Sequence, residues 1–392
     1  GSLPLATEIF QEGLRIPPVT VVRAGRVDRD VVQLMLANVR TPEEREGDLA
    51  AQIAANRIGE RRLLDLVATH GRRTVVAAME ALQDYAERMT RQAIRAIPDG
   101  TYRFADFLDD DGLSDDPIRI AVAVTIRDDA VHIDFTGTDP QVRGSVNAIK
   151  PIVLSAVFYV IRCLIDLDLP SNAGCMRPVT VVAPEGTVIN ARFPAPVAGG
   201  NVETSPRIVD VLLGAFAQAM PEAIPAASAG TMNNLTLGGY DPIRSRPFAY
   251  YETIAGGMGA GSKGPGLNAV HTHMTNTMNT PVEALEYAYP FRVVRYGLRA
   301  GSGGAGRHRG GDGVVREVEL LCDASLTLLS DRRRRGPYGL RGGRPGKPGR
   351  NLLRTGRRVE VLPGKVNRSV AAGQIVSIHT PGGGGFGRPR PR

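Results

Sequence analysis

The segment from Gly199 to Phe216 constrains the fold most, because a glycine-containing turn runs directly into an apolar helix pattern. Gly199 and Gly200 let the backbone bend freely. Ser205 is a favourable N-cap, and Pro206 suits the first position of a helix. The apolar residues that follow recur at helical spacing and predict one buried side of a helix over 205–220. They are Ile208, Val209, Leu212, Leu213 and Phe216.

Three polar residues of this turn, Asn201, Glu203 and Thr204, lie just before the predicted helix. Free N–H groups and the helix dipole favour anionic or carbonyl oxygens at such a position. We therefore expect Glu203 to stay ionised and to act as a catalytic carboxylate, with Asn201 and Thr204 binding substrate. The same residue types also satisfy the backbone of tight turns, so a purely structural role is the alternative.

The bulk properties of the 392 residues indicate a globular protein of one large domain or two to three ordinary ones. Cys163, Cys175 and Cys322 are scattered, which indicates neither a disulfide framework nor a cysteine-rich zinc site and fits a reducing compartment. The longest apolar run, residues 152–161, is too short to cross a bilayer. We expect a cytoplasmic protein that does not bind membranes.

The net charge of +8 is unevenly distributed along the chain. Residues 331–392 contain 16 basic and 2 acidic side chains, against 32 basic and 38 acidic in residues 1–330. This tail offers only Tyr338 and Phe386 for stacking on bases, so we expect no nucleic-acid binding. Within the basic run that starts at Arg332, we expect Arg332 and Arg333 to bind phosphate or to contact a partner subunit.

The first hundred residues have helical patterns. Residues 27–39 fit a short helix, residues 43–70 fit an amphipathic helix that Gly71 ends, and residues 74–96 fit a third helix. The last two predict a helical hairpin. The apolar positions that define the buried face of the 43–70 helix are Leu49, Ile53, Ile58, Leu63, Leu64 and Val67.

Strand patterns dominate after residue 100. Apolar runs on either side of Asp128-Asp129 predict a β-hairpin over 118–135. Residues 151–166 are expected to form a buried helix, and residues 256–266 a flexible glycine-rich loop. Strands are expected at 179–182, 188–190, 314–330 and 350–380.

The predicted class is therefore α+β, with an N-terminal helical segment followed by a mixed, strand-rich, glycine-rich region. We divide the chain into three regions. Residues 1–100 form an extended segment and the helical hairpin, residues 101–300 a central α+β core with the candidate site, and residues 301–392 a β-rich, Arg/Gly-rich C-terminal region.

His271 and His273 are the closest pair among six histidines. In a strand, residues i and i+2 point to one face, so both imidazoles could reach one metal ion or one substrate. A metal site needs a third or fourth ligand, and we assign no metal ligand here. Two hydrogen-bonded structural histidines are the alternative. We take both as catalytic candidates together with Glu283, which could accept a proton or orient a histidine. Polar neighbours expected to bind substrate are Asn276, Asn279 and Thr280.

Several long motifs resemble the hydantoinase B/oxoprolinase family. They are Gly199–Asp210, Gly230–Asn234, His273–Pro281, Arg309–Arg316, Thr380–Gly387 and the N-terminal Ala6–Pro18. The resemblance covers essentially the whole chain in the family's order. It implies the B-type component of an ATP-dependent hetero-oligomer, in which a hydantoinase A-like partner subunit binds ATP and activates a small cyclic amide for hydrolysis. Acetone and acetophenone carboxylases share this fold and carboxylate an activated ketone, so a ligase subunit or a non-catalytic scaffold is the alternative.

The resemblance also implies substrate contacts and a cofactor. Like Asn276 and Asn279, Asn233 and Asn234 could donate hydrogen bonds to an amide or carboxylate group of the substrate. A divalent metal, Zn or Mn, is implied as well, with ligands expected in a further N-terminal region that precedes the part represented here. Met278 departs from the family pattern, which commonly has arginine there. Methionine removes a bidentate donor from this loop.

Overall fold

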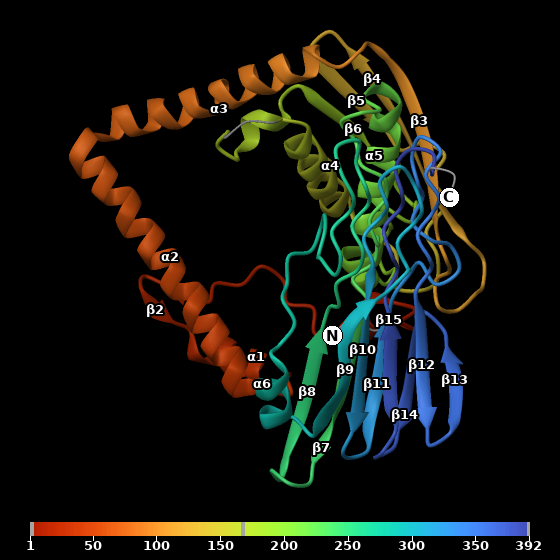
Figure 1. The fold of residues 1–392 in the computed structure, drawn as a ribbon. Helices are drawn as coiled ribbons and strands as arrows, with labels where there is room; N and C mark the ends of the chain where they lie inside the picture. The colour runs from red at the N-terminus through yellow and green to blue at the C-terminus, as the bar shows by residue number, and fades with distance from the viewer. Residues whose placement is uncertain (1–3, 166–168, 390–392) are drawn as a thin grey trace.

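The computed structural model describes residues 4–165 and 169–389. The chain builds two hydrophobic cores, one from helices and a four-stranded sheet and the other from two stacked sheets (Figure 1). The predicted α+β class, with helices first and a strand-rich region after them, is confirmed. No helix in the described ranges is long and apolar enough to cross a membrane.

The N-terminal part forms an open helical arm, which we define as α2 and α3. The elements of the whole N-terminal part are η1 (Ile9–Glu12), β1 (Val22–Arg23), β2 (Arg26–Val27), α1 (Arg29–Leu36), α2 (Pro42–His70) and α3 (Arg72–Arg95). The chain turns between α2 and α3 at Gly71, whose φ of 78° lies in the left-handed region. Figure 1 shows the two helices of the expected helical hairpin as the limbs of an open V, so they do not pack against each other along their length. None of the 29 residues of α2, all of which the structure describes, is buried. The buried face predicted for this helix is therefore wrong.

The first core lies between a sheet and two central helices. The sheet has the order β3-β4-β5-β6, antiparallel except for β5 and β6. Helix α5 packs on β3 and β4, and α4 packs on α5. The predicted hairpin over 118–135 is confirmed as β4 and β5. The elements of this core are β3 (Gly100–Leu108), β4 (Ile118–Arg127), β5 (Ala130–Asp134), α4 (Lys150–Leu164), η2 (Ala173–Met176), β6 (Val179–Val182), η3 (Gly200–Thr204) and α5 (Ser205–Ala219).

The second core is a β-sandwich. Its sheets have the orders β13-β12-β15-β10-β9 and β14-β11-β7-β8. The strands predicted within 314–330 and 350–380 are confirmed, whereas residues 188–190 contribute only an isolated bridge to Thr187. The elements are β7 (Asn234–Asp241), β8 (Arg246–Glu252), α6 (Val282–Ala288), β9 (Phe291–Arg299), β10 (Gly313–Leu320), β11 (Ala324–Leu329), β12 (Arg350–Thr355), β13 (Arg358–Leu362), β14 (Lys365–Val370) and β15 (Ile375–His379). The boundary that we placed between residues 300 and 301 separates strands that pair with each other, such as β7 and β11.

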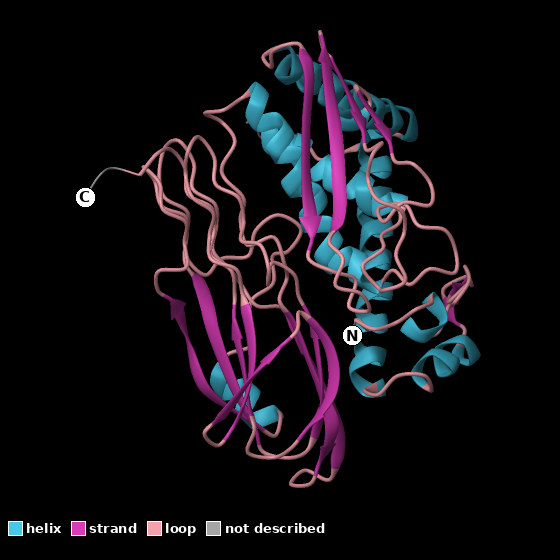
Figure 2. Ribbon diagram, turned by 90° about the vertical axis from the view of Figure 1, so that its right-hand side faces the viewer, coloured by secondary structure: helices cyan, strands magenta, loops and turns pink. Residues whose placement is uncertain are grey.

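The glycine-rich loops form a tightly packed layer beyond the strand ends of the sandwich. Figure 2 shows them as extended segments that run side by side. A Cβ atom on Gly257 would lie 2.0 Å from the carbonyl oxygen of Gly311, and one on Gly383 would lie 2.0 Å from that of Met258. Backbone hydrogen bonds join the segments, for example from Gly383 N–H to the Gly311 carbonyl oxygen at 2.9 Å. Within residues 256–266, four glycines therefore serve close packing and not the flexibility that we expected, whereas Gly261 and Gly264 have open space around them.

Candidate functional site

The turn before α5 is helical rather than a loop. Residues Gly200–Thr204 form a single π-helical turn that continues directly into α5. Ser205 does not cap the helix; its hydroxyl donates to the carbonyl oxygen of Asn201 at 2.5 Å. A Cβ atom on Gly200 would lie 2.1 Å from the carbonyl oxygen of Asn147, so close packing, rather than bending, explains the glycine. A π turn often marks a functional segment of a helix.

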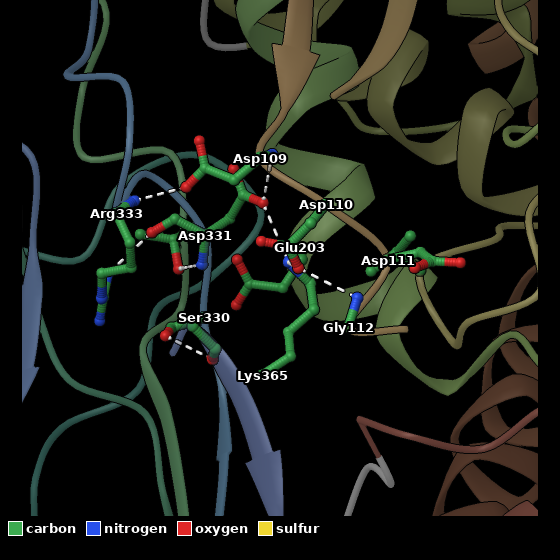
Figure 3. A network of polar contacts seen from close by, with 12 residues as sticks. Asp109, Asp110, Asp111, Gly112, Glu203, Ser330, Asp331, Arg333 and Lys365 are labelled. Atoms are coloured by element: carbon green, nitrogen blue, oxygen red, sulfur yellow. Dashed lines mark hydrogen bonds and ion pairs between the residues drawn. The ribbon is translucent and has the colours of Figure 1, made fainter. Parts of the chain in front are cut away.

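The first turns of α5 carry charged side chains into a buried junction between the two cores. Arg207 is fully buried and donates to Asp106 and Asp331, with both N–O distances 3.0 Å. Lys365, also buried, lies 3.3 Å from Asp331 and 3.2 Å from Asp110. Figure 3 shows that this network gathers side chains from distant parts of the chain around Asp331. Paired charges of this kind fix how the two cores meet, since removing one partner leaves a buried charge unpaired.

Glu203 lies in this junction and is completely buried. Its Oε1 accepts hydrogen bonds from the Met232 backbone N–H at 3.3 Å and from Asn234 Nδ2 at 2.8 Å. Its Oε2 has no hydrogen-bond partner among the described residues. Burial, followed by the nearby Asp331 carboxylate, raises the pKa of Glu203 to about 8.

The expectation that Glu203 stays ionised is therefore wrong at neutral pH. A helix N-terminus favours an anion by only ~0.3–1 kcal/mol at exposed positions. Moving a carboxylate out of water costs far more, and burial therefore favours protonation. Asp109 resembles Glu203, since burial raises its pKa and its Oδ1 has no partner in the described part of the chain.

The two arginine candidates have structural partners. Arg332 is buried, and its Nη2 lies 2.6 Å from Asp106 and 2.7 Å from Asp210. The expected phosphate or partner contact is thus wrong for Arg332, because its guanidinium is enclosed by its own carboxylates. Arg333 donates to amide and carbonyl oxygens, including Asn351 Oδ1 at 2.9 Å, and burial lowers its pKa to about 10. Its proposed contact with phosphate or a partner stays a prediction.

His271 and His273 meet at one small cavity beside the start of α5. Its wall also includes Pro206 and Thr231, and its volume is about 10 Å³. A cavity of this size holds about one water molecule when polar groups surround it. Glu203 is not part of this wall, but it lies close to Thr231, which belongs to the wall. The structure thus places Glu203 behind the cavity wall and not directly against the two histidines.

Each histidine is held through Nδ1 and leaves Nε2 free. The Nδ1 atom of His271 lies 3.4 Å from Thr275 Oγ1, and that of His273 lies 3.2 Å from Tyr159 Oη. Both Nε2 atoms are buried and lack a hydrogen-bond partner within the described residues. Burial lowers the pKa of both imidazoles, so both are neutral at pH 7. An unpaired buried polar atom costs ~1–3 kcal/mol, which indicates that a polar ligand or water completes this cavity.

The other candidate residues divide into buried supports and exposed groups. Asn234 donates to Glu203 and accepts from Tyr251 at 2.6 Å, so its amide supports the junction. Asn233 accepts from Arg333 at 2.9 Å, and Thr204 donates to the Val146 carbonyl oxygen. Three of the remaining candidates are exposed: Asn201, Asn276 and Glu283. The other two, Asn279 and Thr280, are partly buried close to β8.

Sequence reasoning missed several residues that shape the site. Tyr159, Arg207 and Asp331 lie far apart in the sequence, and no local pattern joins them. Two signals were present. The run Asp109 to Asp111 ends a strand, and Lys365 is one of only four lysines in the chain. Neither signal states which residues meet, because that depends on tertiary contacts.

The residues described here do not form a complete metal site. No group of three or more His, Cys, Asp or Glu side chains within residues 4–165 and 169–389 could hold a metal ion. His271 and His273 would supply two nitrogen ligands at most, fewer than the three protein ligands usual for a catalytic zinc. We therefore assign no chemical step to a metal.

Comparison with known proteins agrees with the motifs and the fold. The sequence model of the Hydantoinase B/oxoprolinase family matches residues 1–389, and the chain belongs to this family. It is 39% identical to 5-oxoprolinase 1 of Arabidopsis thaliana over 99% of this chain, which spans 32% of that protein. It is 35% identical to the B-type component of a putative D-/L-hydantoinase of Pseudomonas sp., over 99% of this chain and 67% of that component.

A solved structure has the same fold over nearly the whole chain. The ATP-dependent caprolactamase from Pseudomonas jessenii superposes with a TM-score of 0.89 and 31% sequence identity. The match covers 98% of this chain and 69% of the caprolactamase chain. The family therefore contains hydrolases of cyclic amides, and this chain spans only part of the relatives it matches.

Proposed function

We propose that this chain is the B-type component of an ATP-dependent amidohydrolase, which hydrolyses a cyclic amide activated by an A-type partner subunit. One observation carries the proposal: two imidazoles line the same water-sized cavity, and each has a buried Nε2 atom without a partner among the described residues. Hydrolysis needs a held water molecule and a group that accepts its proton. A family member that acts on a lactam, the caprolactamase, supports a cyclic amide as substrate.

In this proposal His273 is the general base. Its lowered pKa keeps the imidazole unprotonated at neutral pH, so the lone pair of Nε2 can accept a proton from the water as it attacks the carbonyl carbon. His271 holds the same water through its own Nε2. The exposed amides Asn201 and Asn276 remain candidates for binding the substrate outside the cavity. ATP would act in the partner subunit, and a Zn or Mn ion would be held by ligands outside the residues described.

A reconstituted complex tests this proposal. The chain, joined to the N-terminal region that the family implies, is combined with an A-type subunit and assayed for ATP-dependent opening of a panel of lactams and hydantoins. We expect ring opening in the wild type and a decrease in kcat of ~100-fold or more in His273→Gln, as loss of a general base causes. His132→Gln, which changes an exposed histidine on β5, is the matched control.

Two results would contradict the proposal. One is full hydrolytic activity in His273→Gln. The other is a complex that opens no ring but consumes ATP while it carboxylates a ketone with bicarbonate, which would favour the carboxylase alternative.

A further inference from the structure

Tyr159 on α4 contacts the imidazole of His273 through both its hydroxyl and its ring. Its Oη lies 3.2 Å from His273 Nδ1, and the two rings meet edge to face with centroids 5.8 Å apart. The backbone N–H of His273 also lies close enough to this oxygen to influence the ionisation of the phenol. His273 has a φ of 62°, in the left-handed region that residues other than glycine rarely adopt. Such strained positions persist only where neighbours enforce them, and they cluster at functional sites.

The direction of the Tyr159 hydroxyl proton determines which nitrogen of the His273 imidazole is protonated. The hydroxyl has one proton to donate and two lone pairs to accept with. Cys163 lies four residues further along α4, on the same face of the helix, and its thiol interacts with the Tyr159 hydroxyl. If the phenol proton points to Cys163 Sγ, both lone pairs of Oη are left for His273. With the phenol proton directed away, the oxygen that lies 3.2 Å from Nδ1 acts as an acceptor, which requires a proton on Nδ1.

We propose that Tyr159 is a positioning residue that holds His273 as the Nδ1–H tautomer and so directs the Nε2 lone pair into the cavity. The role rests on the proposed function, in which that lone pair accepts the proton of water. A hydrogen bond at one ring nitrogen sets which nitrogen is protonated, so the second nitrogen becomes the base. Tyr159 needs no contact with substrate for this role.

Side-chain ¹⁵N NMR of the histidine-labelled chain tests the inference without any activity. With only six histidines, single His→Gln variants assign the signals. We expect His273 to carry its proton on Nδ1 in the wild type at neutral pH, and to shift to Nε2–H in Tyr159→Phe. Tyr102→Phe is the matched control, since it removes a hydroxyl that bonds the Pro98 carbonyl oxygen at 2.9 Å, away from the cavity. An Nε2–H tautomer in the wild type, or an unchanged Nδ1–H tautomer in Tyr159→Phe, would overturn the inference.

A second variant covers the case in which Tyr159→Phe fails to fold. In Cys163→Ala the phenol proton loses its acceptor and can turn to His273 Nδ1, so we expect part of the Nε2–H tautomer to appear. In the reconstituted complex, Tyr159→Phe should lower kcat about tenfold, at the small end of general-base effects, with little change in KM. No loss of kcat with a changed tautomer would disprove the catalytic role of Tyr159, whereas a complex inactive even as wild type would refute only the proposed function.

Discussion

Helices α5 and α2 both contain many apolar residues, yet they lie in opposite environments. In α5 every residue from Ser205 to Ala217 is buried, including two charged side chains, Arg207 and Asp210. In α2, which is almost twice as long, no residue is buried, although Ile58, Leu63 and Leu64 are apolar. Apolar content alone therefore does not decide which helix becomes part of a core.

The arrangement of the apolar residues explains part of the difference. On α2 the exposed residues Ile58, Leu63, Leu64 and Leu66 point in different directions around the helix axis at 100° per residue. Apolar residues therefore lie on more than one side of α2. Helix α5 lies between the sheet and α4 and packs on both. It is surrounded on all sides, so its polar residues must find partners inside the junction.

The largest expected effect is the loss of Arg207. Arg207→Ala would leave Asp331 and Asp106 with fewer cationic partners in a buried junction, so we expect the free energy of unfolding to fall by ~3–5 kcal/mol. Arg62→Ala on α2 is the matched control; this exposed arginine has no ion pair among the described residues, and we expect a change within ~0.5 kcal/mol. Urea denaturation followed by circular dichroism measures both. Similar losses in the two variants would show that the arm, too, depends on its charges.

The second effect is a pH dependence at Glu203. The folded pKa of about 8 lies above the ordinary value of 4.5, so burial of the protonated group contributes stability that is fully present below pH 4.5. This contribution is lost as the pH rises through about 8. Between pH 5 and 9 we expect the wild type to lose on the order of a few kcal/mol that Glu203→Gln keeps, since glutamine does not ionise. Parallel curves of unfolding free energy against pH for the two proteins would contradict this.

The smallest pair of effects concerns one glycine in each helix. A Cβ atom on Gly214 of α5 would lie 2.4 Å from the Phe104 ring, whereas one on Gly59 of α2 would meet nothing within 4 Å. We expect Gly214→Ala to destabilise by ~1–3 kcal/mol through overpacking. Gly59→Ala should stabilise by up to ~1 kcal/mol, since alanine is the better helix former. Thermal unfolding of both variants gives the signs, and equal signs would mean that the two helices are packed alike.

The sequence was a good guide to element type and a poor one to packing. The hairpin of β4 and β5, the helix α4 and the sandwich strands β10 to β15 follow from alternation and turn residues, which are local properties. The sandwich strands β7, β8 and β9 were not predicted. The strand expected at 188–190 did not form, because only one bridge joins Thr187 and Asn190. At the candidate site, His271 and His273 do line one cavity, but they lie in an irregular segment and not in the strand from which we predicted that they share a face. The contribution of Tyr159 did not follow from the sequence, because it comes from a helix more than a hundred residues earlier.

By itself the sequence determined the fold class, most helices and strands, and the family, since each depends on local patterns and motif order. Only the tertiary structure decided the ionisation state of Glu203, the enclosure of Arg332 and the exposure of α2. The physical reason is that desolvation and charge pairing depend on what surrounds a group in space. The sequence around a carboxylate at a helix start is the same whether water or Asp331 lies beside it, but the pKa of the carboxylate differs between the two surroundings.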